Sequence, residues 1–92
     1  MIKKFKHKGL KELFESGNAK GINPEHTSRL RKILALLETA ETLEDMNLPG
    51  LHLHQLKGSR RGTWAVRVSG NWRVTFRLKE GDIIDVDYED YH

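Results

Sequence analysis

The spacing of apolar residues changes near the middle of this chain, and the change constrains the fold more than any other feature. In the first half, apolar residues recur three and four positions apart, the spacing of one face of a helix. In the second half they recur at every second position, the spacing of one face of a strand. This alternation covers residues 51–53, 64–68, 72–78 and 84–88. The sequence therefore predicts an α+β fold, with helices first and an antiparallel sheet after them.

Two helices are predicted before residue 50. The first ends at Gly17, and its apolar face holds Leu10, Leu13 and Phe14. The second begins at Asn23, which can cap a helix, and Pro24 suits the first helical position. It should run for about four to five turns, with an apolar face of Leu30, Ile33, Leu34 and Leu37. A short strand at residues 2–5 would extend the sheet to four or five strands.

The length and composition limit the class of protein. Ninety-two residues supply one modest core, so a single domain spanning residues 1–92 is expected. The chain has no cysteine, which excludes a disulfide framework, a thiolate metal site and a cysteine nucleophile. The basic N-terminus lacks the apolar run of a signal peptide. We therefore expect a cytoplasmic protein with no membrane partner.

Charge is divided unevenly along the second half. Residues 52–79 carry seven Lys or Arg and no acid, whereas residues 80–92 carry six acids and no Lys or Arg. The chain ends at Asp90-Tyr91-His92. A basic surface can hold a polyanion, and an imidazole beside a carboxylate can transfer protons. This arrangement predicts chemistry on a nucleic-acid backbone.

The register of the central hairpin decides where its arginines point. Burial of the apolar residues favours an odd-numbered turn centred on Gly70, with three facing pairs: Val68 with Trp72, Val66 with Val74, and Arg67 with Arg73. A two-residue turn would instead pair Val68 with Arg73 and mix the two faces. Like charges directly across a strand pair are destabilising. The arginine pair is therefore either a place for an anion or a pair of solvated side chains on an open face.

Several basic residues are candidates for holding phosphate. Lys57 follows a short apolar run and precedes Gly58, so its ammonium group could reach a phosphate over the sheet. Arg60 and Arg61 lie in a loop flanked by glycines, where we expect them to be flexible and to bind distant phosphates. Arg73 lies in mid-strand, so its guanidinium should be rigid and could bind phosphate oxygens in bidentate fashion. A purely solubilising charge is the alternative for the loop residues.

The chain end supplies the candidates for proton transfer. Carboxylates near His92, including that of Asp90, favour the charged imidazolium, which is a proton donor at neutral pH. The alternative is an inert chain end. His52 and His54 could join His92 around zinc, but we expect no metal because cysteine and an established ligand spacing are both absent.

Together these residues resemble a known family, the HigB toxins of the RelE/ParE superfamily, also called plasmid-maintenance killer proteins. The resemblance spans the chain and is carried by residues 2–10 (IKKFKHKGL), 53–58 (LHQLKG), 62–68 (GTWAVRV), 71–76 (NWRVTF) and 87–92 (DYEDYH). It implies two N-terminal helices packed on a mainly antiparallel sheet. It also implies a bacterial type II toxin held inactive by a HigA-like, helix-turn-helix antitoxin, through which the complex binds operator DNA.

The activity implied by this resemblance is a ribosome-dependent endoribonuclease that cuts messenger RNA in the ribosomal A site without a metal or other cofactor. For such a reaction we assign proton transfer to Asp90 or His92, with His92 preferred as the acid. Lys57 and Arg73 are assigned to stabilising charge on the phosphoryl oxygens. By resemblance, further site residues are His54, Arg67 and Tyr91.

Basic residues in the first half are expected to contact ribosomal RNA, with a solvated face as the alternative. They are Lys3, Lys4, Lys6, Lys8, Lys11, Arg29, Arg31 and Lys32. Two other functions remain open at this point. One is a ParE-like toxin that binds DNA gyrase without cutting RNA, and the other is a non-catalytic RNA-binding module.

Overall fold

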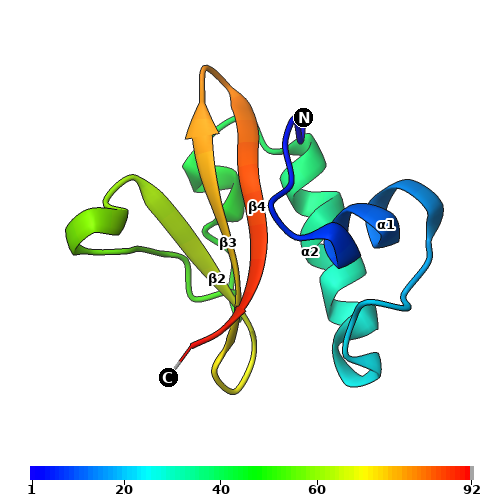
Figure 1. The fold of residues 1–92 in the computed structure, drawn as a ribbon. Coiled ribbons are helices and arrows are strands. Elements are labelled where there is room, and N and C mark those ends of the chain that lie inside the picture. The colour runs from blue at the N-terminus through cyan, green and yellow to red at the C-terminus, as the bar shows by residue number, and fades with distance from the viewer. Residues whose placement is uncertain (92) are drawn as a thin grey trace.

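In the computed structural model, which describes residues 1–91, two α-helices cover one face of a four-stranded antiparallel sheet (Figure 1). The helices are α1 (Lys8–Ser16) and α2 (Thr27–Thr39), and short 3-10 turns form at Pro24–His26, Leu43–Met46 and Gly58–Arg60. The strands are β1 (His54–Gln55), β2 (Thr63–Ser69), β3 (Trp72–Lys79) and β4 (Asp82–Asp90), and they lie in the order β1-β2-β3-β4. The predicted α+β architecture, with helices preceding an antiparallel sheet, is confirmed.

The N-terminal segment runs beside β4 in the parallel direction. The Lys3 amide donates to the Ile83 carbonyl at 2.8 Å, and the Lys6 amide donates to the Val86 carbonyl at 2.8 Å. The pairing amounts to two isolated bridges at Ile2 and Phe5 rather than a regular strand. The strand predicted at residues 2–5 is therefore present only as an irregular edge of the sheet.

The start and end of α1, and the start of the turn that leads into α2, lie at residues that satisfy or relax terminal backbone groups. His7 Nδ1 accepts a hydrogen bond from the Leu10 amide at 3.2 Å at the start of α1. The helix ends at Gly17, whose φ of 77° is a left-handed conformation that glycine adopts at little cost. The predicted cap at Asn23 is also present, since its side chain accepts from the Glu25 amide at 3.0 Å. The first turn after Asn23 is a 3-10 turn, and α2 continues from it.

The core lies between the helices and the sheet. The predicted apolar face of α2 is confirmed, because Leu30, Ile33, Leu34 and Leu37 are all buried. The strands supply the buried side chains of Val66, Val68, Val74, Phe76, Ile83, Val86 and Tyr88, which alternate along β2 and β3. In residues 1–91, no helix is long and apolar enough to cross a membrane.

The hairpin register agrees with the prediction except next to the turn. Val66 lies opposite Val74 and Arg67 opposite Arg73, as predicted. The pairing of Val68 with Trp72 was wrong, because Ser69 faces Trp72 and the register shifts between Arg67 and Ser69. A β-bulge adds one residue to one strand of a pair. The bulge lets a short turn close the hairpin while the apolar side chains stay on the core face.

A second irregularity lies in β4. The register shifts between Thr75 and Arg77 of β3, opposite the part of β4 where Asp85 has a φ of 53°. The alternation predicted at residues 84–88 is therefore interrupted, and Ile83 rather than Ile84 is the buried residue. The extra residue at this bulge shifts the pattern by one position.

Candidate nucleic-acid interface on the open sheet face

The sheet face that the helices leave uncovered (Figure 1) carries three of the predicted site residues in its strands, namely His54, Arg67 and Arg73. Residues opposite each other on antiparallel strands share a face, and successive residues alternate between faces. Because Val66 and Val74 face the core, their neighbours point the other way. We call this surface the open sheet face, and its strand residues are His54, Thr63, Ala65, Arg67, Arg73, Thr75, Arg77, Asp87 and Glu89.

Three charged residues form a row across this face. Arg67 lies opposite Arg73, and Arg73 lies opposite Glu89. Arg67 is exposed, whereas Arg73 is half-buried. Arg73 Nη1 donates to the Gly70 carbonyl at 2.7 Å and to the Trp72 carbonyl at 3.0 Å. These two bonds hold the guanidinium against the β2–β3 turn, in agreement with the rigidity predicted for Arg73.

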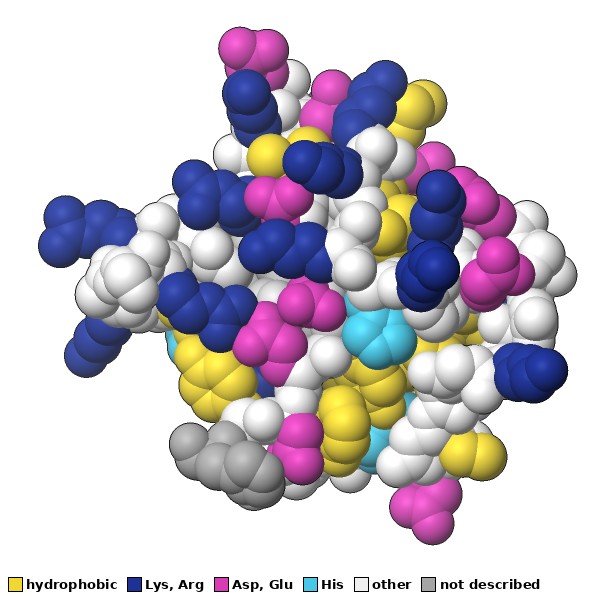
Figure 2. Space-filling view, viewed as in Figure 1, with side chains coloured by type: hydrophobic (Ala, Val, Ile, Leu, Met, Phe, Trp, Pro, Cys, Tyr) yellow, Lys and Arg dark blue, Asp and Glu magenta, His cyan; other side chains and the backbone are white. Residues whose placement is uncertain are grey.

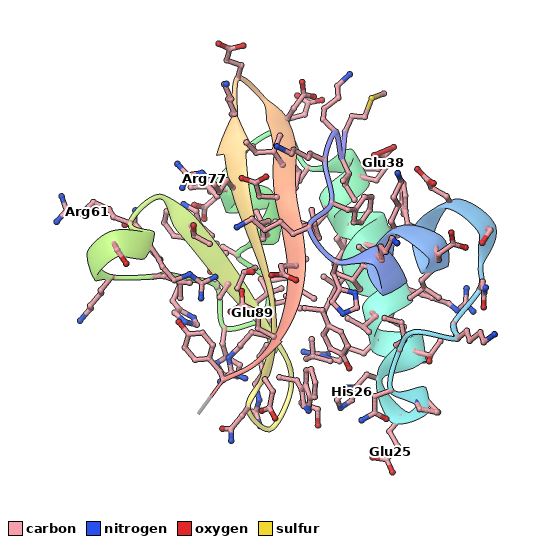
Figure 3. The ribbon with its side chains drawn as sticks, viewed as in Figure 1. Glu25, His26, Glu38, Arg61, Arg77 and Glu89 are labelled. Carbon is pink, nitrogen blue, oxygen red and sulfur yellow. The ribbon has the colours of Figure 1, made fainter. Side chains whose placement is uncertain are left out.

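Glu89, labelled in Figure 3, accepts three side-chain hydrogen bonds on the open sheet face. Arg60 Nη1 donates to Oε1 at 2.9 Å and Nη2 donates to Oε2 at 2.6 Å, which is a bidentate pair. The buried Thr75 hydroxyl donates to Oε2 at 2.6 Å. The bonds from Arg60 hold the pKa of Glu89 below its usual value, although burial opposes them and the Thr75 bond adds to them. Donating these hydrogen bonds to Glu89 raises the pKa of Arg60, while burial lowers it.

The prediction that Arg60 is flexible was therefore wrong. Its guanidinium is fixed by Glu89, a residue that lies 29 positions away in sequence. Arg61, the next residue, is exposed and extends away from the sheet, as expected for a loop cation (Figure 3). In the space-filling view, Lys and Arg side chains spread over the sheet side of the molecule with a few acidic side chains among them (Figure 2).

His54 and Lys57 lie at the β1 edge of the sheet. His54 is exposed, and its Nδ1 lies 2.9 Å from the His52 carbonyl oxygen. A carbonyl oxygen can only accept, so Nδ1 is the donor in this contact and Nε2 is the ring nitrogen left for a ligand. Lys57 is exposed and immediately precedes the Gly58–Arg60 turn. Both side chains are accessible to an RNA strand that crosses the sheet.

The end of β4 divides the last predicted residues between two faces. Tyr91 is tied to the β2–β3 turn, because its amide donates to the Asn71 carbonyl at 2.7 Å. Asp90 lies opposite Trp72, and so shares the face of Trp72 and Tyr88 rather than that of Arg73. Burial raises the pKa of Tyr88, and the charge of Asp90 adds to this effect. His92 lies outside the described residues.

Several polar residues have structural contacts that sequence reasoning missed. His26 is buried, and its Nδ1 lies 2.5 Å from the Tyr88 hydroxyl. Arg29 Nη2 donates to the Gly50 carbonyl at 2.7 Å and to the Arg67 carbonyl at 3.2 Å. Arg31 Nη2 donates to the Gly17 carbonyl at 3.2 Å. Two of the eight cations expected on ribosomal RNA therefore also brace the fold. No sequence signal indicated these long-range partners, and the position of Glu89 opposite Arg73 is known only from the register of β3 with β4.

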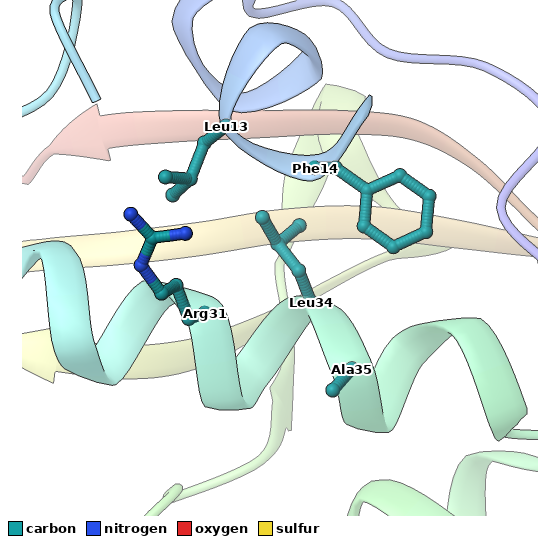
Figure 4. Close-up of a pocket in the computed structure, with 5 residues that line it drawn as sticks. All are labelled: Leu13, Phe14, Arg31, Leu34 and Ala35. Carbon is teal, nitrogen blue, oxygen red and sulfur yellow. The ribbon is translucent and has the colours of Figure 1, made fainter. Parts of the chain in front are cut away.

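A cavity of about 210 Å³ lies between the two helices, away from the open sheet face (Figure 4). It is lined by Leu13, Phe14, Arg31, Leu34 and Ala35, and none of these is a predicted site residue. Among residues 1–91, no three His, Cys, Asp or Glu side chains are grouped so that they could hold a metal ion. Within the described part of the chain, the predicted phosphate-binding residues Arg67 and Arg73 thus lie on the open sheet face and not in this cavity.

Comparisons with known proteins agree with this geometry. Residues 3–92 match the family model described as the RelE-like toxin of type II toxin-antitoxin system HigB. The chain is also 45% identical over 92 residues to the endoribonuclease HigB of Proteus vulgaris, and the alignment covers 100% of both chains.

Proposed function

The chain belongs to the HigB-like family of type II toxins, and we propose that it cuts messenger RNA in the ribosomal A site in a ribosome-dependent reaction. Membership of this family makes the chain an endoribonuclease toxin that has an antitoxin partner. We further propose that this antitoxin is a HigA-like helix-turn-helix protein, and that the toxin-antitoxin complex binds operator DNA through it. The toxin family match supports the choice of partner.

The observation that carries the proposal is the fixed guanidinium of Arg73 on an uncovered sheet face. Its Nη1 is held by two backbone carbonyls, and Arg67 lies directly opposite. Donors held in place before the reaction stabilise developing charge without having to reorganise. A phosphate placed over this row would meet two guanidinium groups, which suits the charge that builds on phosphoryl oxygens during cleavage.

The proposed reaction uses the RNA as its own nucleophile. The 2′-oxygen forms a bond to the adjacent phosphorus as its proton passes to a base, and the bond from phosphorus to the 5′-oxygen breaks as an acid protonates that oxygen. Arg73 and Lys57 stabilise the negative phosphoryl oxygens. We assign the proton transfers to Asp90 or His92, with His92 as the preferred acid, because Asp90 shares the sheet face of Trp72 rather than that of Arg73. No redox step or added cofactor is needed to balance this reaction.

The remaining residues of the open sheet face are proposed to hold the RNA strand. His54 offers its Nε2 to a hydroxyl group, and Arg67 offers a cation to phosphate. Tyr91 can stack on a base, an interaction worth about 1–3 kcal/mol in single-strand binders. Arg61 binds a more distant phosphate from its loop.

Ribosome dependence has a physical basis in the shape of this face. The proposed RNA-binding residues lie on an open sheet face and do not line the cavity between the helices, and we propose that free RNA is held loosely there. A ribosome that fixes the message in a cleavable geometry could lower the barrier by up to about 7–11 kcal/mol through positioning alone. The exposed lysines of the N-terminal segment, among them Lys3, Lys4 and Lys8, are proposed to contact ribosomal RNA.

The decisive experiment maps transcript ends after brief induction in cells, comparing the wild type with His92→Gln. We expect cuts inside translated codons in the wild type and their loss in the variant, since general acids contribute about 10² to 10⁴-fold. The same message incubated with purified protein should be cut only when it is bound to ribosomes. Cleavage of free message at the same sites and rate would contradict ribosome dependence, and full toxicity of His92→Gln would remove the assigned acid.

A further inference from the structure

Glu89 makes contacts that no role assigned so far explains. It is the carboxylate in the charged row of the open sheet face, and its side chain is only 23% exposed. Both of its oxygens accept from Arg60, and Oε2 also accepts from Thr75. A carboxylate repels phosphate, so direct RNA contact by Glu89 would oppose binding rather than help it. We therefore ask which part of the structure the contacts of Glu89 keep in place.

The Arg60–Glu89 pair spans the sheet. Arg60 closes the Gly58–Arg60 turn between β1 and β2, whereas Glu89 belongs to β4 on the far side of β3. Two strand spacings, roughly 10 Å, separate β2 from β4. The pair therefore ties the loop at one side of the open sheet face to the strand at the other side.

The backbone alone holds this loop weakly. The strand that leads into it, β1, has only two residues. Beyond β1, the Leu56 amide donates to the Thr63 carbonyl at 2.8 Å and the Arg61 amide donates to the Gly58 carbonyl at 3.1 Å. The second of these bonds lies within the turn and does not attach it to the sheet. Lys57, which is exposed, begins this segment.

We infer that Glu89 is a positioning residue, which fixes Lys57 relative to Arg73 by holding Arg60 across the open sheet face. In this inference, Arg60 anchors the Gly58–Arg60 turn by pairing with Glu89, and it does not bind a phosphate of the RNA. Thr75, buried below the pair, orients the carboxylate through its hydroxyl. This inference rests on the proposed function for its consequence in catalysis, but the restraint on the loop is independent of that function.

The catalytic test compares Glu89→Ala, Arg60→Ala and the double variant in ribosome-dependent cleavage of a defined message. A misplacement of about 1 Å can cost on the order of 10²-fold in rate, so we expect each single variant to lower the rate at saturating protein by about 10 to 100-fold. The half-saturating concentration should change by less than about twofold, because ground-state binding is retained. The double variant should be no slower than either single variant, since both remove one contact.

Reversal of the pair separates positioning from RNA binding. The charge swap Arg60→Glu with Glu89→Arg should restore the rate to within about threefold, because it rebuilds the same contact with its charges exchanged. Glu80→Gln, at the β3–β4 turn, is the matched control and should behave like the wild type. Two outcomes would show that Arg60 contacts RNA and would overturn the inference. One is that the losses of the single variants add up in the double variant. The other is that the swap stays inactive while Arg60→Ala weakens the salt dependence of binding.

Amide hydrogen exchange tests the restraint without any cleavage assay. Exchange at the Leu56 and Arg61 amides should become faster in Glu89→Ala and return to the wild-type rate in the charge swap. If the wild type cuts no message while this pattern holds, the proposed function fails and the restraint stands. If exchange is unchanged in Glu89→Ala, the restraint is refuted whatever the activity. Should Glu89→Ala not fold, Glu89→Gln is measured instead under the same criteria.

Discussion

Arg67 and Arg73 lie directly opposite each other on β2 and β3, on the sheet face that the helices leave uncovered. Like charges in this position destabilise a strand pair. Arg73 has Glu89 on its other side, but the carboxylate of Glu89 is already bound by Arg60 and Thr75. The repulsion is therefore retained in the folded protein, and an anion seated over the two arginines would relieve it.

Replacement of Arg67 should make the protein more stable and weaken its binding to RNA. In Arg67→Gln we expect the free energy of unfolding at low salt to rise by roughly 0.2–1 kcal/mol, because the cross-strand repulsion is removed. Affinity for single-stranded RNA should fall, and the slope of log affinity against log salt should decrease by about 0.7, the value for one phosphate contact. Urea titration and salt-dependent binding measure the two effects. A variant that is less stable and binds RNA as before would contradict both expectations.

Arg73 should be far more sensitive than Arg67 in the cleavage assay. Removal of one preorganised donor to a developing negative charge costs about 10²–10³-fold in rate, and we expect this loss in Arg73→Ala. Arg73→Lys keeps the charge but not the planar guanidinium group, so its cleavage rate should lie between those of the wild type and Arg73→Ala. Single-turnover cleavage on ribosomes measures the rates, and thermal melting checks the β2–β3 turn that Arg73 braces. Cleavage by a folded Arg73→Ala at the wild-type rate would exclude the residue from the site.

The elements of this fold could be predicted because their signals are local. Gly17 ends α1 and Asn23 caps the turn that leads into α2, and each acts on backbone groups within a few residues. The alternation in β2 and β3 was equally readable, and it placed Arg67 opposite Arg73. The bulges could not be foreseen, because an extra residue in one strand is defined only by the strand that it pairs with.

The candidate site was predictable in its residue types but not in its contacts. Arg60 was expected to be loose because a loop flanked by glycines suggests mobility, and its partner Glu89 is remote in sequence. The face of Asp90 depends on the register at the very end of β4, which pairs it with Trp72. Such relationships arise from packing of distant segments, which local composition does not encode.

The buried contact between His26 and Tyr88 can be tested by removing one hydroxyl. Tyr88→Phe leaves His26 Nδ1 without this partner in a site where the histidine is 6% exposed. We expect the free energy of unfolding to fall by about 1–3 kcal/mol, the cost of leaving a buried polar group unsatisfied. Urea denaturation measures the change. In the Tyr88→Phe background, His26→Leu should recover part of the loss, and a further large loss would contradict this account.

Gly9 should show the reverse of the usual effect of glycine in a helix. Glycine to alanine within a helix normally stabilises by about 1 kcal/mol. A Cβ at Gly9 would lie 2.7 Å from the Gly21 carbonyl oxygen, a backbone atom. We therefore expect Gly9→Ala to lower the free energy of unfolding by about 1–3 kcal/mol through overpacking. Lys11→Ala, on the exposed side of α1, is the control, and a Gly9→Ala protein as stable as the wild type would show that the loop can move away.

The Arg60–Glu89 pair should make the free energy of unfolding decrease as the pH falls through the acid range. The pKa of Glu89 is lowered by its bonds with Arg60, against the opposing effect of burial. The unfolded chain therefore binds the Glu89 proton more readily than the folded protein, so stability rises with pH across this window. The contribution of Glu89 is complete above the unfolded carboxyl pKa, about 4.3, and is lost as the pH falls through the lower folded value.

Urea midpoints measured from neutral pH down through this window for the wild type and Glu89→Gln isolate the effect. At neutral pH we expect the variant to be the less stable, because the neutral amide gives up the ionic pairing with Arg60. The difference between the two proteins should shrink below about pH 4.3, since protonation removes the same charge from the wild type. Glu15→Gln, on the exposed side of α1, should keep the wild-type curve. If the wild-type and Glu89→Gln curves run parallel through the acid range, the bidentate pair contributes nothing that depends on the charge of Glu89, and its hold on the loop would have to come from packing alone.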